Sequence, residues 1–236
     1  MAGAVYSGLV GALRVLASVF CLLAISFALL AHDIPSDVAV QAFVKPEGTR
    51  LRLLVRVPLK AMRDVNFPLR GPGFLDLSRA DPFLDDAARL WISDSVEMFE
   101  GDARTAPPRL AAVRVSLPSD RSFVSYDAAL TNVFGPHLQE NTDIPWDQAM
   151  LDALFEYPIA SDQSKFSIVP TFARLGIRVV TVLRFLPPGG AVRAFEYAGD
   201  PGRVQLDPRW HQAALRFIRL GFVHILSGTD HLLFLF

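Results

Sequence analysis

The chain has 236 residues, of which 51% are hydrophobic and 20% are charged, and its formal net charge is -1 at pH 7. This composition supports a sizeable core and argues against wholesale disorder. The chain lacks a basic stripe, which excludes an electrostatic basis for nucleic-acid binding. The single cysteine, Cys21, lies in an N-terminal apolar run, so the remaining sequence can form no disulfide and no cysteine-based metal or redox site.

The N-terminal segment has the order of an export signal. Residues 15–31 carry no charge, follow Arg14 and end on Ala31. A positively charged start, an apolar stretch and a small residue at the cleavage site are typical of a signal peptide. We therefore expect residues 1–31 to be removed by cleavage after Ala31. The run is nearly long enough to span a bilayer, so an uncleaved N-terminal anchor is the alternative. In both cases the following domain, residues 32–206, is expected to be exported.

Residues 32–206 predict a mainly β domain. Seven stretches are rich in β-branched and aromatic residues and alternate or cluster as strands do: 38–45, 50–58, 108–117, 152–159, 165–172, 177–186 and 192–199. Pro-Glu-Gly at 46–48 and Pro-Pro-Gly-Gly at 187–190 are turn sequences between neighbouring stretches. We therefore expect a β-sandwich-like exported domain.

Two further stretches predict helices inserted into this domain. Residues 80–101 begin with an Asp-Pro start signal, carry apolar residues at helical spacing and end at Gly101. Residues 119–135 have a similar pattern and end at Gly135. The acidic side chains of the first stretch are expected on the solvated face of a helix: Asp81, Asp85, Asp86, Asp94, Glu97 and Glu100.

Residues 207–236 have a different pattern. Asp207 suits a helix cap, Trp210 suits a membrane interface, and the following residues predict an amphipathic helix that lies on a bilayer before entering it. From Leu220 the chain becomes predominantly apolar, which predicts an α-helical membrane segment truncated at Phe236, with further membrane helices missing. The alternative is a short C-terminal helix packed on the core of the domain.

Three ionisable residues in this apolar segment are the candidate metal ligands: His224, Asp230 and His231. Such residues are costly in a membrane span and usually face a cavity, an ion path or a partner. On a helix the two histidines share a face but lie about 10.5 Å apart along the axis. A shared ion therefore requires a kink near Gly228, and separate sites require ligands from other helices. A proton relay, a polar helix contact and a soluble core position are the alternatives.

The segment GFVHILSGTDHLLFLF resembles the first membrane segment of the HupE/UreJ family, whose mark is His, five residues and Asp-His. His224, Asp230 and His231 match that mark, and Ala31-His32 resembles the start of the exported domain in some relatives. The resemblance covers about the last twenty residues. It implies a bacterial inner-membrane protein for nickel or cobalt uptake, with residues 32–206 on the periplasmic side. The implied partners are the lipid bilayer, the divalent metal ion and other envelope proteins.

Two other functions are compatible with this sequence. One is a membrane-anchored envelope binding module with no transport role. The other is an intramembrane metallohydrolase, which lacks a compact His-Glu-x-x-His arrangement here. We expect no enzyme, since no phosphate loop, nucleophile elbow or pair of catalytic acids stands in a suitable context. His32 is a weaker candidate metal ligand, whereas His137 and His211 are expected in a loop and at a helix start.

Overall fold

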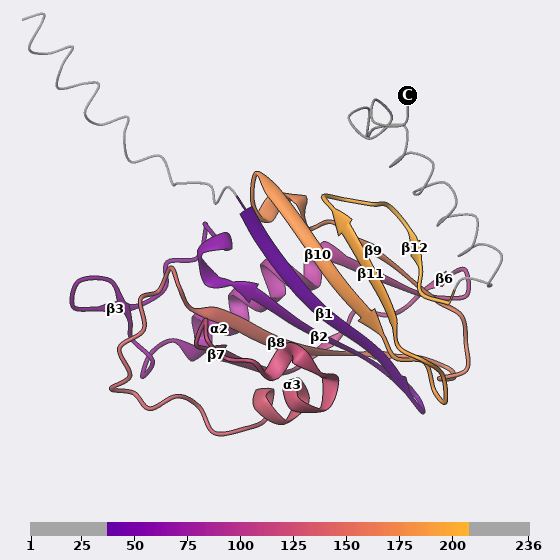
Figure 1. Ribbon diagram of the computed structural model, residues 1–236, viewed down its shortest axis with the longest axis horizontal. Helices are drawn as coiled ribbons and strands as arrows, with labels where there is room; N and C mark the ends of the chain where they lie inside the picture. The colour runs from indigo at the N-terminus through magenta and orange to yellow at the C-terminus, as the bar shows by residue number, and fades with distance from the viewer. Residues whose placement is uncertain (1–36, 208–236) are drawn as a thin grey trace, which may run out of the picture. The chain divides into compact units, whose positions relative to one another are not determined.

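The computed structural model describes residues 37–207, which form a mainly β structure (Figure 1). The longer strands are β1 (Asp37–Glu47), β2 (Arg50–Pro58), β5 (Val96–Glu100), β7 (Arg109–Ser116), β8 (Met150–Pro158), β9 (Phe166–Pro170), β10 (Arg178–Phe185) and β11 (Arg193–Ala198). The two-residue strands are β3 (Leu69–Arg70), β4 (Phe74–Leu75), β6 (Ala103–Arg104) and β12 (Val204–Gln205). The α-helices of this part are α2 (Asp81–Ala87) and α3 (Tyr126–Val133).

The strands form a mixed sheet, an antiparallel sheet and a small two-stranded ribbon. The mixed sheet has six strands in the order β11-β10-β1-β2-β8-β7, and only its β1–β10 pair is parallel. The antiparallel sheet has four strands in the order β12-β9-β5-β6. Strands β3 and β4 pair with each other. The order of the mixed sheet brings β2 beside β8, about a hundred residues later in the chain.

The alternation of side chains explains why β1 and β2 form the centre of the mixed sheet. Val38, Val40, Ala42 and Val44 are all buried, because alternate residues of a strand point to the same face. The strands are joined at Gly48, whose φ of +60° is a conformation that glycine adopts without steric cost. The turn therefore fixes the register in which Glu47 pairs with Arg50.

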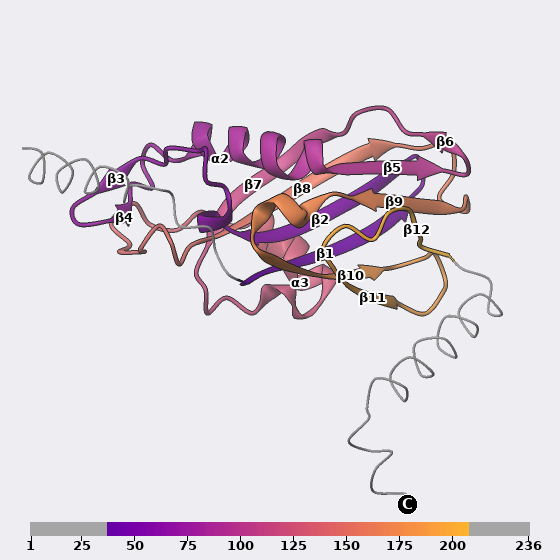
Figure 2. The same ribbon diagram turned by 90° about the horizontal axis from the view of Figure 1, so that it is seen from above.

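One hydrophobic core is shared by the two larger sheets. Leu53 and Phe155 reach it from the mixed sheet, and Met98, Phe166 and Ile168 reach it from the antiparallel sheet. Figure 2 shows α3 on one side of the mixed sheet and β5, β9 and α2 on the other. We call the side that α3 covers the outer face. A smaller apolar cluster joins α3 to this outer face and includes Phe43, Leu54, Phe123, Tyr126, Ala129, Val133 and Leu154.

The two ends of the described chain lie at opposite ends of the mixed sheet. β1 begins at Asp37 and runs to the turn at residues 47–50, which marks what we call the turn end. Parallel β10 finishes at Phe185 beside Val44, and Phe185 pairs with Arg193. Arg193 contacts Asp207 and donates to the Leu206 carbonyl at 3.4 Å. Asp207 therefore lies at the turn end, away from Asp37.

All seven predicted strands are confirmed, and the predicted helix over 80–101 is wrong in its last part. Residues 96–100 form β5, which pairs antiparallel with β9 from Val96↔Pro170 to Glu100↔Phe166. Val96 and Met98 are buried and alternate with less buried residues, so the local apolar pattern fits a strand once a partner is present. The helical part ends earlier, in a π turn at Ala88–Ile92 and a 3-10 turn at Ser93–Ser95.

The second predicted helix is present but shorter than residues 119–135. A 3-10 turn covers Ser122–Val124, and α3 begins after Ser125. The Ser125 hydroxyl accepts a hydrogen bond from the Ala128 N–H at 3.3 Å, which caps the helix. The cap explains why α3 begins at Tyr126.

The predicted signal or anchor at 1–31 and nearly all of the predicted membrane-associated region at 207–236 lie outside the described residues. Asp207 is the one residue of that region that the structure describes. Between residues 37 and 207, no helix combines the length and the apolar character needed to cross a bilayer.

Candidate functional site

The predicted metal ligands His224, Asp230 and His231 lie outside residues 37–207, and so do His32 and His211. Their grouping therefore stays a prediction. Within the described range, no group of three or more His, Cys, Asp or Glu side chains is arranged to hold a metal ion.

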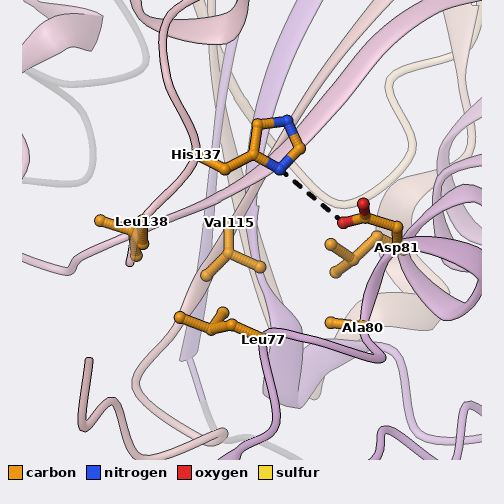
Figure 3. Close-up of a pocket in the computed structure, with 7 residues that line it drawn as sticks. Leu77, Ala80, Asp81, Val115, His137 and Leu138 are labelled. Carbon is orange, nitrogen blue, oxygen red and sulfur yellow. Dashed lines mark ion pairs between the residues drawn. The ribbon is translucent and has the colours of Figure 1, made fainter. Parts of the chain in front are cut away.

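His137 lies in a loop, as predicted, and is paired with an acid of α2. Figure 3 shows its imidazole directed towards Asp81, with Nδ1 3.8 Å from Oδ1. Both side chains are exposed, so water screens the pair and it contributes little to stability. The adjacent cavity of about 20 Å³ is lined mainly by apolar side chains, including Val115 and Leu138. It has room for about one water molecule.

The sequence-based expectation for the acidic residues of 80–101 is correct only in part. Asp81, Asp85 and Asp86 are exposed on α2. Glu100 instead ends β5 and is partly buried. It accepts hydrogen bonds from the Ala160 and Ser161 N–H groups at 2.8 and 3.0 Å. Burial raises the pKa of Glu100, but these bonds and one from the Ser164 hydroxyl outweigh it and lower the pKa overall.

A buried ion pair joins β2 to β8 on the outer face. Arg56 is 4% exposed and Asp152 is 0% exposed. The guanidinium donates from Nε to Asp152 Oδ1 at 2.6 Å and from Nη2 to Oδ2 at 2.7 Å, which is the bidentate geometry of the strongest arginine–carboxylate pairs. The pair forms because Arg56 and Asp152 stand directly opposite each other in the β2–β8 register.

Neighbouring groups satisfy the remaining polar atoms of this pair. Asp152 Oδ2 also accepts from the Ser116 hydroxyl at 2.6 Å and from Asn132 Nδ2 at 3.1 Å. Arg56 donates to both the carbonyl and the carboxylate of Asp120, each at 2.8 Å. Burial raises the pKa of Asp120, but bonds from Ser122 and Arg56 outweigh it and lower the pKa. The network thus ties β7, α3 and the turn at residues 120–122 to β2 and β8.

A second carboxylate on the outer face, Glu156, is surrounded by three arginines. Arg109 donates to Oε2 at 2.6 Å, and Arg52 and Arg50 donate to Oε1 at 3.3 and 3.5 Å. Burial raises the pKa of Glu156, but the bonds from Arg109 and Arg52 outweigh it, so the pKa lies below its ordinary value of 4.5. Asp152 and Glu156 each form ion pairs with arginines. We therefore infer that these two carboxylates of the outer face stabilise the fold.

The lowered pKa of Glu156 predicts a pH-dependent contribution to stability. A carboxyl group that binds protons more weakly when folded stabilises the fold fully above its unfolded pKa, near 4.5, and loses that effect as the pH falls through its folded pKa. We expect Glu156→Gln to be less stable than wild type at pH 7 and the difference to shrink towards pH 3. Urea titrations at both pH values measure this. The Glu196→Gln control changes an exposed glutamate and should be as stable as wild type at pH 7. A Glu156→Gln deficit of the same size at both pH values would contradict the assignment.

A groove of about 580 Å³ lies between β5 and the segment that leads into β7. One wall is formed by residues 93–98 and the other by residues 104–108, and Tyr157 of β8 contributes to the lining. The lining combines apolar side chains with two acids, Asp94 and Glu97, and one base, Arg104. The groove is not evident from the amino-acid sequence, because its walls come from segments whose pairing depends on the fold.

A scan of the chain against protein-family models and a search of curated proteins both find no match.

Proposed function

We propose that this chain is the front portion of a bacterial inner-membrane protein for the uptake of a transition metal, nickel or cobalt. The motif His224, Asp230 and His231 in an apolar segment carries the proposal. A neutral imidazole is the commonest metal-binding side chain in proteins, and a carboxylate adds negative charge to balance a divalent cation. In an apolar environment such groups are costly without an ion or a partner. Coordination of a metal ion would offset the free-energy cost of placing these two imidazoles and one carboxylate in an apolar segment.

Each motif residue has a distinct role in this proposal. His224 and His231 supply neutral ring nitrogens that bind the ion during its passage, together with ligands from further membrane helices. Asp230 projects about 100° from His231 on a helix. It either completes the coordination across a helix interface or accepts a hydrogen bond from an imidazole and so fixes its orientation. The metal ion is the cargo of this site.

The described domain suits a position between an export signal and a membrane segment. It has its own hydrophobic core, and the sequence after Cys21 contains no cysteine, so folding after export requires no disulfide. Asp207 lies at the turn end of the mixed sheet. If the following residues enter the bilayer, the turns near that end are those closest to the membrane surface. In the same proposal, the two sheets form a β-sandwich that is exported, followed by an α-helical membrane segment.

Labelling of intact spheroplasts tests the proposed location. In a Cys21→Ser background, Ala198→Cys places one thiol on an exposed position of β11. We expect a membrane-impermeant maleimide to label this variant without permeabilising the cells. Ala153→Cys is the matched control: Ala153 is fully buried and should be labelled only after denaturation. Labelling of Ala198→Cys only after permeabilisation would contradict the periplasmic location.

A further inference from the structure

The turn that joins β10 to β11 has a composition that its geometry does not require. Residues 186–192 read LPPGGAV and carry no charged or hydrogen-bonding side chain. Proline and glycine account for the turn itself, and Gly189 has a φ of +65°, which glycine adopts without steric cost. Surface turns usually add polar side chains such as Asn, Asp or Ser. Here the chain has Ala191 and Val192 instead.

The apolar end of this turn is open to solvent. Residues 188–192, which we call the turn tip, are all exposed, and Val192 is 56% exposed. Leu186 at the base packs against the smaller apolar cluster of the outer face, and its N–H donates to the Val44 carbonyl at 2.9 Å. The sheet therefore holds the base of the turn, while the tip presents apolar surface. Removing such surface from water is favourable, so the tip suits an apolar environment.

Two neighbouring turns at the same end of the mixed sheet are polar. The β1–β2 turn carries Thr49 and Arg50, and the loop between β8 and β9 carries Asp162 and Lys165. The Gly48 N–H donates to the Asp162 carboxylate at 2.9 Å, which places these two turns side by side. The β10–β11 turn lies at this turn end as well, because β10 runs parallel to β1 (Figure 1). It differs from both neighbours in having no polar side chain.

The β10–β11 turn also lies next to the point where the described chain ends. Arg193 directly follows the turn tip, contacts Asp207 and donates to the Leu206 carbonyl at 3.4 Å. Trp210 is three residues beyond Asp207, and three residues of chain span at most about 11 Å. The sequence predicts that Trp210 lies at a membrane interface. A tryptophan in that position brings the turn tip close to the same interface.

We propose that the turn tip inserts into the surface layer of the lipid bilayer, so that the domain contacts the membrane there as well as through the chain after Asp207. This contact rests on the proposed function in one respect: the chain after Asp207 must enter the bilayer. The tip would lie between headgroups and acyl chains, where apolar side chains leave water and the backbone still reaches polar groups. Ala198, about 20 Å from Val192 along β11, would stay in water.

Fluorescence quenching tests this contact with the complete protein reconstituted into phosphatidylcholine vesicles. In a background without other cysteines, Val192→Cys carries the environment-sensitive label NBD. Lipid with a doxyl group at carbon 5 of its acyl chain quenches the label only where the label reaches the bilayer. We expect quenching of at least about 2-fold at Val192→Cys, as for a group at the acyl-chain boundary, and none at the exposed Ala198→Cys control. Equal quenching at the two positions overturns the proposal.

A second pair of variants separates the turn tip from apolar exposure in general. Ile177 is 75% exposed and precedes Arg178, which pairs with Asp37 at the opposite end of the mixed sheet. With the label on Ala191→Cys, Val192→Asp should lower the quenching at least about 2-fold, because a carboxylate resists entry into the bilayer. Ile177→Asp should leave the quenching unchanged. The proposal is also overturned if the two aspartate variants are quenched equally.

An alkaline carbonate wash of the vesicles distinguishes failure of this contact from failure of the proposed function. A protein inserted through membrane helices stays in the vesicles after the wash. Retained protein with equal quenching at Val192→Cys and Ala198→Cys overturns the turn contact alone. Release of the protein by the wash contradicts the proposed membrane segment, and the turn contact with it.

Discussion

Cells that express the complete protein with His224→Ala or His231→Ala are expected to accumulate no more nickel or cobalt than cells without the protein. Each change removes an imidazole that we propose binds the ion during its passage. Uptake of radioactive nickel or cobalt over time measures this. Immunoblots of membrane fractions should show both variants at the wild-type level.

Two other histidines provide matched controls for this prediction. His137→Ala and His211→Ala remove imidazoles outside the motif, and both variants should accumulate metal normally. Normal accumulation in both motif variants would contradict a transport role. The alternative of a membrane-anchored binding module would then be favoured, and it predicts that the isolated domain, residues 32–206, retains the full activity.

Asp152→Ala is expected to destabilise the domain by about 3–5 kcal/mol, the typical cost of removing one partner of a buried ion pair. The change leaves the Arg56 guanidinium buried with no carboxylate at its Nε, and it also removes the acceptor for Ser116 and Asn132. Urea denaturation followed by tryptophan fluorescence measures the free energy of unfolding, because Trp91 and Trp146 lie in the described domain.

The double variant Arg56→Met/Asp152→Leu should be more stable than Asp152→Ala, because no uncompensated charge remains buried. Asp143→Ala is the surface control: it removes the partner of Arg70 at 2.8 Å, a pair in which the acid is 64% exposed, and should cost at most about 1 kcal/mol. A loss for Asp152→Ala as small as that for Asp143→Ala would contradict the structural role of the buried pair.

The strands were predictable from sequence because their local patterns match their environments. The stretch at 177–186 is rich in β-branched and apolar residues and forms β10, in which buried positions alternate with less buried ones. The stretch at 50–58 is a cluster of apolar residues and arginines and forms β2, which is buried on both faces from Leu53 to Val57. Residues 96–100 were not predictable in this way. VEMFE is short and follows a helical stretch without a break, and it becomes β5 because β9, about seventy residues later, pairs with it.

The ion pairs of the outer face could not be predicted from local sequence patterns either. Charged residues alternate with apolar ones in β2, so the sequence does indicate a polar face there. Which acid meets Arg56 depends on the β2–β8 register, which joins residues about a hundred positions apart. The groove beside β5 could not be predicted for the same reason: Tyr157 and residues 93–98 are far apart in the sequence and come together only when the chain folds. The metal motif is a local pattern in residues that the structure does not describe, so it rests on the sequence.

Metal binding by the purified complete protein tests the central claim, that costly ionisable side chains lie in the apolar segment because they coordinate an ion. Calorimetric titration with nickel, combined with X-ray absorption of the bound metal, should show a bound ion with imidazole nitrogen ligands. Both signals should be lost in the His224→Ala/His231→Ala double variant and kept in His137→Ala. Equal binding by the wild type and the double variant, or no binding by either, would contradict the account.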